Sequence, residues 1–261
     1  MSTSLDILAF FAHPDDETML CGGTLALLAR LGARVHILIA TRGEGGEMGE
    51  PPLCKREQLG LIRANELRCA ARALGAASLS MMDFVDPLIG PGDQLFPFTE
   101  DIDTLTAQVV EAIRFRRAGV LLAHGINGEY GHPAHVLAHQ AARLAVDALE
   151  NEAPLFYTVQ GAFPGHPHPR LANADAPAHL LLDVQPVLAQ KTAAALCHRT
   201  QHALFVRRPS QELQRTVSVP EVIQPVESLH RVWPPVEGSS LEDKLADLLL
   251  ASGHVSLPEA G

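Results

Sequence analysis

Apolar runs of the β type alternate with helical patterns along the first 160 residues, and this alternation limits the fold more than any other feature. The runs are apolar over almost their whole length, which indicates strands buried on both faces; they cover 5–12, 34–41, 77–84, 118–125 and 154–159. Helical patterns lie between them, over 24–32, 55–75, 99–117 and 133–150. Such an order predicts a parallel sheet covered by helices.

The fold class expected from this order is α/β, a Rossmann-like three-layer α/β/α arrangement with a mostly parallel sheet. After residue 160 the pattern loosens into a segment rich in turn residues, "GAFPGHPHPRLANADAPAH", which predicts a surface loop. A strand over 179–184, a helix over about 186–202 and an amphipathic helix in "SLEDKLADLLL" follow. The proline-rich stretches over 207–235 read as connections. We therefore expect one domain over 1–261, with a core over 1–205 and a C-terminal segment over 206–261 that packs on it.

Composition excludes several classes of protein. The formal net charge of −10 disfavours binding to nucleic acid or anionic membranes, since either would call for a basic face. The N-terminal segment has no basic region and only a short apolar run, so it predicts neither a signal peptide nor a membrane span. The four cysteines form no C-x-x-C pair and predict reduced thiols; they are Cys21, Cys54, Cys69 and Cys197. A soluble cytoplasmic protein is expected, and a homo-oligomer stays open.

The densest chemical signal is "AHPDDET" over 12–18, directly after the first predicted strand. One imidazole and three carboxylates lie within five residues there, and the carboxylates repel one another unless a cation is present. A divalent ion supplies that charge, and His13 adds a nitrogen ligand that suits zinc or iron. The alternative is a helix cap, in which Asp15 or Asp16 accepts hydrogen bonds from free backbone amides. Capping requires one acidic residue, so the pattern favours a metal site.

A second cluster, "HGINGEYGHPAHVLAH" over 124–139, follows the fourth predicted strand. His132 and His135 stand at a junction of strand and helix, where ligands bind in parallel sheets. The spacing of three and four residues among His132, His135 and His139 could place pairs on one helix face. We expect His139 to be an ordinary structural residue. Two polar clusters at the ends of two parallel strands can converge on one ion.

These motifs resemble the PIG-L/LmbE family of zinc-dependent de-N-acetylases, which act on small molecules and glycolipids that contain N-acetylglucosamine. The segments that carry the resemblance occur in family order and cover most of the chain: "AHPDDE" (12–17), "TRGEGGE" (41–47), "RANELRCAARALG" (63–75), "NGEYGHPAH" (127–135) and "KTAAALCHRTQ" (191–201). The pair "AHPDDE" and "GHPxH" is the specific part. The glycine-rich segment alone would be a weak signal.

The resemblance implies one divalent ion per chain, held by His13, Asp16 and His135. This set of two imidazoles and one carboxylate leaves a coordination position open for water or substrate. Both Zn²⁺ and Fe²⁺ accept such ligands, with Zn²⁺ the expected ion.

The resemblance also implies the roles of residues around the ion. Asp15 would be the general base that takes a proton from the attacking water and returns it to the departing amine. His132, if protonated, and the Tyr130 hydroxyl would stabilise the oxyanion. Arg63 and Asp86 match positions that hold the sugar or its aglycone, although an arginine on an amphipathic helix is commonly a solvated residue.

Other matching positions imply supporting roles. His198 and Gln201 would line the pocket or orient residues that contact the metal. Glu17 and Glu47 would start a helix and position a loop. The segment 86–98 could act as a lid that excludes water, or be an immobile surface loop.

The sequence thus predicts a metal-dependent amidohydrolase that removes an acetyl group from an N-acetylated sugar substrate. Acyl groups larger than acetyl stay open, as do the aglycone and the physiological substrate. One rival is a metal-dependent phosphoesterase, although two-metal sites usually draw on more carboxylates. Another is a non-catalytic Rossmann-like metal-binding protein, although structural zinc sites are typically closed by four ligands that include cysteine.

Overall fold

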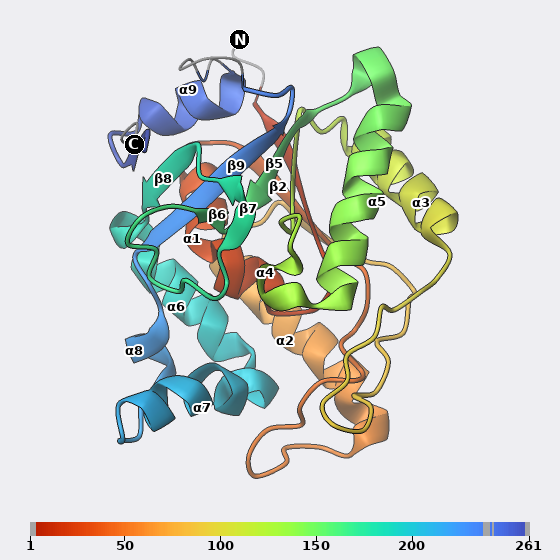
Figure 1. The fold of residues 1–261 in the computed structure, drawn as a ribbon, viewed down its shortest axis with the longest axis vertical. Helices are drawn as coiled ribbons and strands as arrows, with labels where there is room; N and C mark the ends of the chain where they lie inside the picture. The colour runs from red at the N-terminus through yellow and green to blue at the C-terminus, as the bar shows by residue number, and fades with distance from the viewer. Residues whose placement is uncertain (1–3, 237–240, 242, 259–261) are drawn as a thin grey trace.

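The structure is a computed structural model that describes residues 4–236, 241 and 243–258. Its centre is a sheet that has eight strands within the described residues (Figure 1). From one edge to the other, the strands are β10 (Val255–Ser256), β8 (Leu180–Asp183), β9 (Val226–Trp233), β5 (Leu155–Val159), β4 (Val120–Ala123), β1 (Asp6–Phe11), β2 (Arg34–Ile39) and β3 (Ser78–Met81).

The five strands β3, β2, β1, β4 and β5 run parallel, and β9, β8 and β10 extend the sheet in antiparallel pairs. The prediction of a mostly parallel sheet is therefore confirmed. β1 pairs with β2 on one side and with β4 on the other. The chain leaves β1 in one direction through β2 and β3 and then returns to the opposite side of β1. A crevice forms beyond the carboxyl ends of strands at such a switch point, so this is where a ligand is expected.

Helices cover both faces of the sheet, as the three-layer prediction requires (Figure 1). One face packs against α1 (Asp16–Arg30), α2 (Leu59–Ala73) and α6 (Leu188–Cys197), and the other against α3 (Ile102–Arg116) and α5 (Pro133–Leu149). β1 shows why. Ile7, Ala9 and Phe11 belong to the first apolar core and Leu8 and Phe10 to the second, since successive side chains of a strand point to opposite faces.

Shorter elements complete the described fold. They are α4 (Gly128–Gly131), α7 (His202–Glu212), α8 (Val219–Val222), α9 (Lys244–Leu250), β6 (Gly161–Ala162), β7 (Asn173–Pro177) and the 3-10 turns η1 (Arg56–Gln58), η2 (Glu150–Glu152), η3 (Gln185–Val187) and η4 (Arg199–Gln201). β6 and β7 pair with each other in a small second sheet.

The structure corrects three predictions of secondary structure. The stretch over 207–235 is more than connections, because it contains most of α7, all of α8 and the eight-residue strand β9. The predicted surface loop after residue 160 includes β6 and β7. The first helix begins at Asp16 and not at residue 24, with a break in helical geometry at Cys21, where φ is −152°.

The C-terminal segment contributes to the main sheet and to the first core. β9 pairs with β5 in the main sheet, and Leu245, Ala246 and Leu249 of α9 belong to the first core. Residues 240 and 242 of the predicted C-terminal helix lie outside the described residues. The division into one domain with these boundaries stays a prediction.

The expectation of four reduced cysteines is wrong for one pair. Cys69 on α2 and Cys197 at the end of α6 form a disulfide, with their Cα atoms 5.7 Å apart, and Cys21 and Cys54 are free. The two partners are 128 residues apart in sequence, and only the packing of α2 against α6 brings them together.

Within the part of the chain that the structure describes, no helix has the length and apolar character needed to cross a membrane.

Candidate active site

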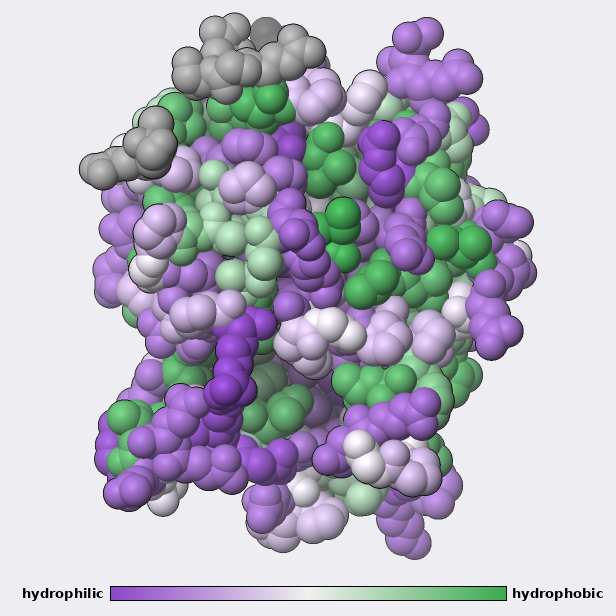
Figure 2. Space-filling model, viewed as in Figure 1, coloured by the Kyte–Doolittle hydropathy of each residue, from purple (hydrophilic) through white to green (hydrophobic). Residues whose placement is uncertain are grey.

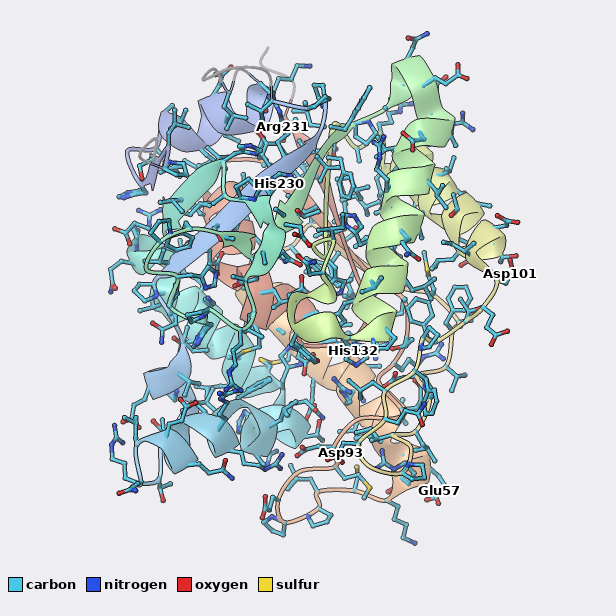
Figure 3. All side chains as sticks on the ribbon, in the orientation of Figure 1. Glu57, Asp93, Asp101, His132, His230 and Arg231 are labelled. Atoms are coloured by element: carbon cyan, nitrogen blue, oxygen red, sulfur yellow. A yellow bond between two sulfur atoms is a disulfide. The ribbon has the colours of Figure 1, made fainter. Side chains whose placement is uncertain are left out.

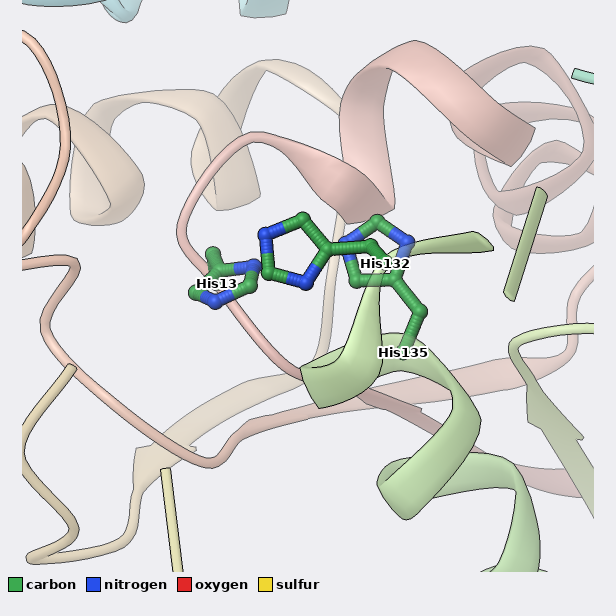
Figure 4. Close-up of side chains that lie close together, drawn as sticks. All are labelled: His13, His132 and His135. Atoms are coloured by element: carbon green, nitrogen blue, oxygen red, sulfur yellow. The ribbon is translucent and has the colours of Figure 1, made fainter. Parts of the chain in front are cut away.

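The two motif clusters meet at the carboxyl ends of β1 and β4, which are neighbouring strands of the sheet. His13, Asp15 and Asp16 follow β1, and His132 and His135 lie where α4 passes into α5. Figure 4 shows the rings of His13, His132 and His135 side by side, the first from the loop after β1 and the other two from α5 and its start. In Figure 3, His132 lies between α4 and the loop that carries Asp93.

Asp15 stands at the N-cap position of α1 but does not cap the helix. Its φ of 114° lies in the left-handed region, and its side chain makes no hydrogen bond to the helix amides. The Asp15 backbone amide instead donates to Glu17 Oε2 at 2.9 Å. The carboxylate Oδ2 lies 3.3 Å from Arg63 Nη2. The capping alternative is therefore wrong for Asp15, and its carboxylate is left for another use.

The surroundings of Asp15 shift its pKa toward neutrality. Burial is the main cause and raises the pKa. The positive charge of Arg63 lowers it, the negative charges of Asp16 and Glu17 raise it further, and the resulting pKa is about 6. A general base acts best when its pKa lies near the working pH. The carboxylate is thus set to accept a proton and to give it back.

His135 is oriented by the buried carboxylate of Glu129. Its Nδ1 donates to Glu129 Oε2 at 2.7 Å, and its Nε2 is buried without any hydrogen-bond partner. Because Nδ1 carries the proton, Nε2 keeps its lone pair. That nitrogen lies 3.3 Å from Asp16 Oδ1. A buried, unpartnered nitrogen beside a carboxylate is the arrangement expected of a metal ligand with a carboxylate behind it.

His13 has a similar arrangement on the other side of Asp16. Its Nε2 lies 3.2 Å from Asp86 Oδ1 and its Nδ1 lies 3.4 Å from Asp16 Oδ2. In the neutral ring, with the proton on Nε2 facing Asp86, the Nδ1 lone pair faces Asp16, the carboxylate that His135 Nε2 also approaches. Burial lowers the pKa of His13, but Asp16 and Asp86 outweigh burial and raise it to about 9. The carboxylates therefore favour positive charge here.

Two overlapping groups of ligand atoms, each within 4.8 Å of one another, occur here among the described residues: His13, His132 and His135, and Asp16, His124 and His135. Hydrogen bonds remove His124 from the candidates. Its Nε2 accepts from the Ala12 amide at 3.1 Å and its Nδ1 donates to Glu129 at 2.9 Å. Neither nitrogen of His124 has a free lone pair, so it supports Glu129 and holds the end of β1.

His132 presents an N–H donor to the site as a neutral ring. The expectation that it must be positively charged to stabilise an oxyanion is therefore corrected. Its Nδ1 accepts from the Ala134 amide at 3.1 Å, so the single proton of the neutral ring lies on Nε2. Burial and the neighbouring His135 and His13 lower its pKa to about 3. A neutral imidazole with Nε2–H can donate to an oxyanion, while it offers no free lone pair to a metal.

Arg63 is buried and not solvated. Its guanidinium donates to the backbone oxygens of Gly43 and Pro14 in addition to its pairing with Asp15. A Cβ atom at Gly43, where φ is +68°, would lie 2.2 Å from the Arg63 guanidinium, so the glycine is required for this approach. Asp86 accepts from the Gly45 amide at 3.2 Å and faces His13. Both residues predicted to bind substrate thus hold other residues of the site, and both also line its cavity.

The cavity measures about 420 Å³, within the range of roughly 300–1,000 Å³ that is typical of ligand sites. Its floor is polar, with His13, Asp15, Asp16 and His132. Tyr130 stands at the mouth with 56% of its surface exposed, and its ring meets that of His132 edge-on. Gln201 and Glu47 also line the cavity, and the Gln201 side chain donates to the Glu47 carbonyl at 2.8 Å.

Two further predicted residues lie behind this floor. His198 is fully buried, and its Nε2 lies 3.0 Å from Glu17 Oε1, so the two residues together hold the backbone of Asp15. His139 donates from Nδ1 to the His124 carbonyl at 2.9 Å and belongs to neither of the metal-ligand groups above. This agrees with its predicted structural role.

Comparison with known proteins supplies an independent view of the chain. The model of the PIG-L family, described as GlcNAc-PI de-N-acetylase, matches residues 8–146, which is more than half of the 261 residues. The chain belongs to this family.

Curated relatives of this PIG-L protein are named 1D-myo-inositol 2-acetamido-2-deoxy-alpha-D-glucopyranoside deacetylase. The one from Geodermatophilus obscurus is 37% identical over 172 residues, which cover 59% of this chain and 56% of the relative. The one from Rhodococcus opacus is 30% identical over 259 residues, which cover 84% of this chain and 89% of the relative. The chain thus spans little more than half of the first relative and most of the second.

Solved structures share the PIG-L fold. A 4-carboxy-2-hydroxymuconate hydratase from Pseudomonas putida has a TM-score of 0.60 at 24% identity, covering 91% of this chain and 100% of its own. The N,N'-diacetylchitobiose deacetylase of Pyrococcus horikoshii has a TM-score of 0.59 at 16% identity, covering 87% of this chain and 83% of its own. A hydratase and a deacetylase therefore have this fold in common, so the fold alone does not select a reaction.

Sequence reasoning missed Glu129 and its support in this PIG-L chain. Glu129 follows Gly128 and has a φ of 57°, and its Oε1 accepts from the Gly125 amide and from the Asn173 side chain at 2.9 and 3.3 Å. An acidic residue six positions before a candidate ligand was a usable signal. No sequence signal pointed to Asn173, because it lies on β7, in a segment that the sequence predicted to be a loop.

Proposed function

We propose that this protein is a metal-dependent amidohydrolase that removes the acetyl group from a small molecule or conjugate containing N-acetylglucosamine. The observation that carries the proposal is the placement of His13 Nδ1 and His135 Nε2 against the two carboxylate oxygens of Asp16, at 3.4 and 3.3 Å. The neighbouring Asp15 carboxylate makes no hydrogen bond to the helix amides. The names of the family and of the curated relatives support the same reaction.

His13, Asp16 and His135 would hold one Zn²⁺ per chain, and Fe²⁺ would accept the same ligands. The donor set fits, because two imidazole nitrogens and one carboxylate leave a coordination position for the reaction. When bound, such an ion lowers the pKa of water toward neutrality and polarises an amide carbonyl. The buried, unpartnered His135 Nε2 is what this assignment explains and a purely structural cluster does not.

The chain's own groups would move the proton. Asp15 accepts it as water attacks the amide carbonyl and then donates it to the nitrogen of the departing amine, so the C–N bond breaks with the amine neutral. His132 donates from Nε2 to the developing oxyanion as a neutral ring, and the Tyr130 hydroxyl assists from the mouth. Arg63 holds Asp15 in place, Asp86 holds His13, and both would contact the sugar where they line the cavity.

The phosphoesterase alternative receives little support from the site. The two arginines that line the cavity already have acidic partners, since Arg63 pairs with Asp15 and Arg207 with Glu47. A phosphate would therefore meet several carboxylates and no free guanidinium among the described lining residues. A cytoplasmic location and the oligomeric state stay predictions.

The test is metal content by elemental analysis together with amine release from N-acetylglucosamine and its glycosides. We expect one metal per chain and measurable release in the wild type, and loss of both in His135→Ala. The matched control is His254→Ala, which changes a histidine of the C-terminal segment outside the cavity. Bound metal without amine release from any of these substrates would support the metal site but contradict the proposed reaction. Absence of metal would overturn the proposal.

A further inference from the structure

The mouth of the cavity has an apolar wall that the deacetylation does not need. Leu88, Ile89, Leu95 and Phe96 of the loop 86–98 line one side, and Leu204 of α7 lines the other. Figure 2 shows hydrophobic residues beside the hollow between α7 and this loop. Because these side chains come from segments more than a hundred residues apart, the wall is built by the fold and not by one apolar stretch of sequence.

Three of these side chains are also exposed to solvent. Leu88 is 60% exposed, Ile89 49% and Leu204 48%. Single exposed leucines are common on protein surfaces, but exposed apolar residues that gather at the rim of a polar cavity mark a binding surface. The cavity is therefore amphipathic, with reacting polar groups at its floor and apolar groups at its mouth.

The apolar surface continues beyond the mouth. A neighbouring recess of about 340 Å³ shares Asp86 and Leu88 with the cavity. Val85 and Leu61 supply exposed apolar side chains to it, and the charged residues Arg42, Glu44, Arg56 and Glu57 line the rest. Val85 is 62% exposed and Leu61 66%. Leu88 therefore stands between the cavity and a recess of mixed apolar and charged lining, whose apolar side chains Val85 and Leu61 lead toward α2.

Charge at the mouth limits what this surface can bind. Arg207 donates to both carboxylate oxygens of Glu47, at 2.6 and 2.8 Å, and so offers no free cation. Asp93 and Asp86 add further negative charge to the lining. A phosphate or carboxylate on the substrate would be repelled here, whereas an uncharged apolar group would cover the exposed leucines.

We propose that the substrate is an N-acetylglucosaminide whose aglycone is an uncharged apolar group, bound by Leu88, Ile89 and Leu204. This inference rests on the proposed function. The acyl group is acetyl in that function and reaches only the floor, so the sugar ring carries the remaining bulk of the substrate to the mouth. The aglycone then lies over Leu88 toward Val85.

The test compares hydrolysis of the methyl and hexyl α-glycosides of N-acetylglucosamine with that of N-acetylglucosamine 1-phosphate. Partial burial of the five additional methylenes should raise kcat/KM about tenfold for the hexyl glycoside over the methyl glycoside. The phosphate should be the poorest substrate. Equal values for the two glycosides, or preference for the phosphate or for a methyl glycoside with a longer N-acyl chain, would overturn the proposal.

Variants locate the effect. Leu88→Ser and Leu204→Ser should each lower the hexyl-to-methyl ratio of kcat/KM several-fold. Phe115→Ser removes an equally apolar and more exposed side chain, 74% exposed on α3, and should keep both the ratio and the activity. A ratio unchanged in both leucine variants, or lowered equally in Phe115→Ser, would count against this wall.

A binding measurement separates this inference from the proposed function. The Asp15→Asn variant is titrated calorimetrically with the methyl and hexyl glycosides. Tighter binding of the hexyl glycoside, with no hydrolysis by the wild type, would support the apolar binding site and contradict the proposed reaction. Equal affinities for the two glycosides, with hydrolysis of both by the wild type, would support the reaction and contradict the apolar binding site.

Discussion

Glu129 Oε2 lies 2.7 Å from Nδ1 of His135, and the same oxygen accepts from Nδ1 of His124 at 2.9 Å. One buried carboxylate thus fixes the proton positions of two imidazoles. Only one of these rings, His135, is left with a free nitrogen.

Replacing Glu129 by glutamine should weaken metal binding by about 10–100-fold, which is the usual effect of changing the partner of a ligating histidine. Glutamine has one acceptor oxygen in place of two, so it cannot accept from both histidines, the Gly125 amide and Asn173. Competition with a chelator measures the affinity. Glu150→Gln is the matched control, because Glu150 also has a positive φ but is exposed. Equal affinities in the two variants would contradict the role of Glu129.

Replacing Asp15 by asparagine should lower turnover by about 10²–10⁴-fold and leave the metal content unchanged. Asparagine tolerates the left-handed backbone at this position, so the fold should persist. Amine release and elemental analysis on the same sample make the comparison. Loss of the metal would mean that Asp15 is a ligand and not the base.

Asp6 should make stability depend on acid pH. It is buried at the start of β1. Burial raises its pKa, but hydrogen bonds from Arg34 and His36 outweigh burial and lower the pKa below its ordinary value. A carboxyl group whose pKa is lowered in the folded state stabilises the fold above its unfolded pKa, and this contribution is lost as pH falls through the folded pKa.

The wild type should therefore exceed Asp6→Asn in free energy of unfolding by about 1–2 kcal/mol at pH 7. The difference should shrink as pH falls below about 4. Urea denaturation at several pH values tests this, and a difference that stays constant down to pH 3 would speak against it.

Glu227 should be a strong determinant of stability. It is 2% exposed, pairs with Lys191 Nζ at 2.8 Å and accepts from the Gly23 and Thr24 amides, so it ties β9 to α1 near the break at Cys21. Glu227→Ala leaves the buried ammonium group of Lys191 without its carboxylate partner and leaves two amides unpaired.

The expected loss in Glu227→Ala is about 3–5 kcal/mol. Glu212→Ala, which removes an exposed ion pair with Arg208, should change stability by less than about 1 kcal/mol. Urea denaturation measures both, and a similar effect of the two substitutions would refute the difference in role.

The sequence predicts the parallel part of the fold well, because most of the strands from β1 to β5 are nearly continuous apolar runs, with the serine-containing β3 as the exception. It does not predict β9, whose flanks are proline-rich and whose pattern includes the buried charges of Glu227 and Arg231. It also misplaces the start of α1. Gly22 and Gly23 interrupt the helical pattern there. The packing of Val184 against Gly23 and the hydrogen bond from the Gly23 amide to Glu227 account for Gly23, and neither is visible in the sequence.

For the site, sequence motifs name the residues but not their hydrogen bonds. The structure brings His13, Asp16 and His135 together as expected, and their assignment as metal ligands stays a proposal. The neutral state of His132 depends on the Ala134 amide, and the exclusion of His124 depends on the Ala12 amide. Backbone donors carry no signal in a sequence, so proton positions could not be derived from it.

Because β1 and β4 are neighbours in the sheet, the residues of the reaction and the residues of the cavity mouth come from different parts of the chain. The reacting residues follow these two strands, while one apolar wall of the mouth comes from the loop 86–98, which follows β3 on the far side of β2. The length and composition of that loop beyond Asp86, which holds His13, can therefore change without moving the strands that carry the floor. A protein built in this way can acquire a new substrate by exchanging one wall while its chemistry stays in place.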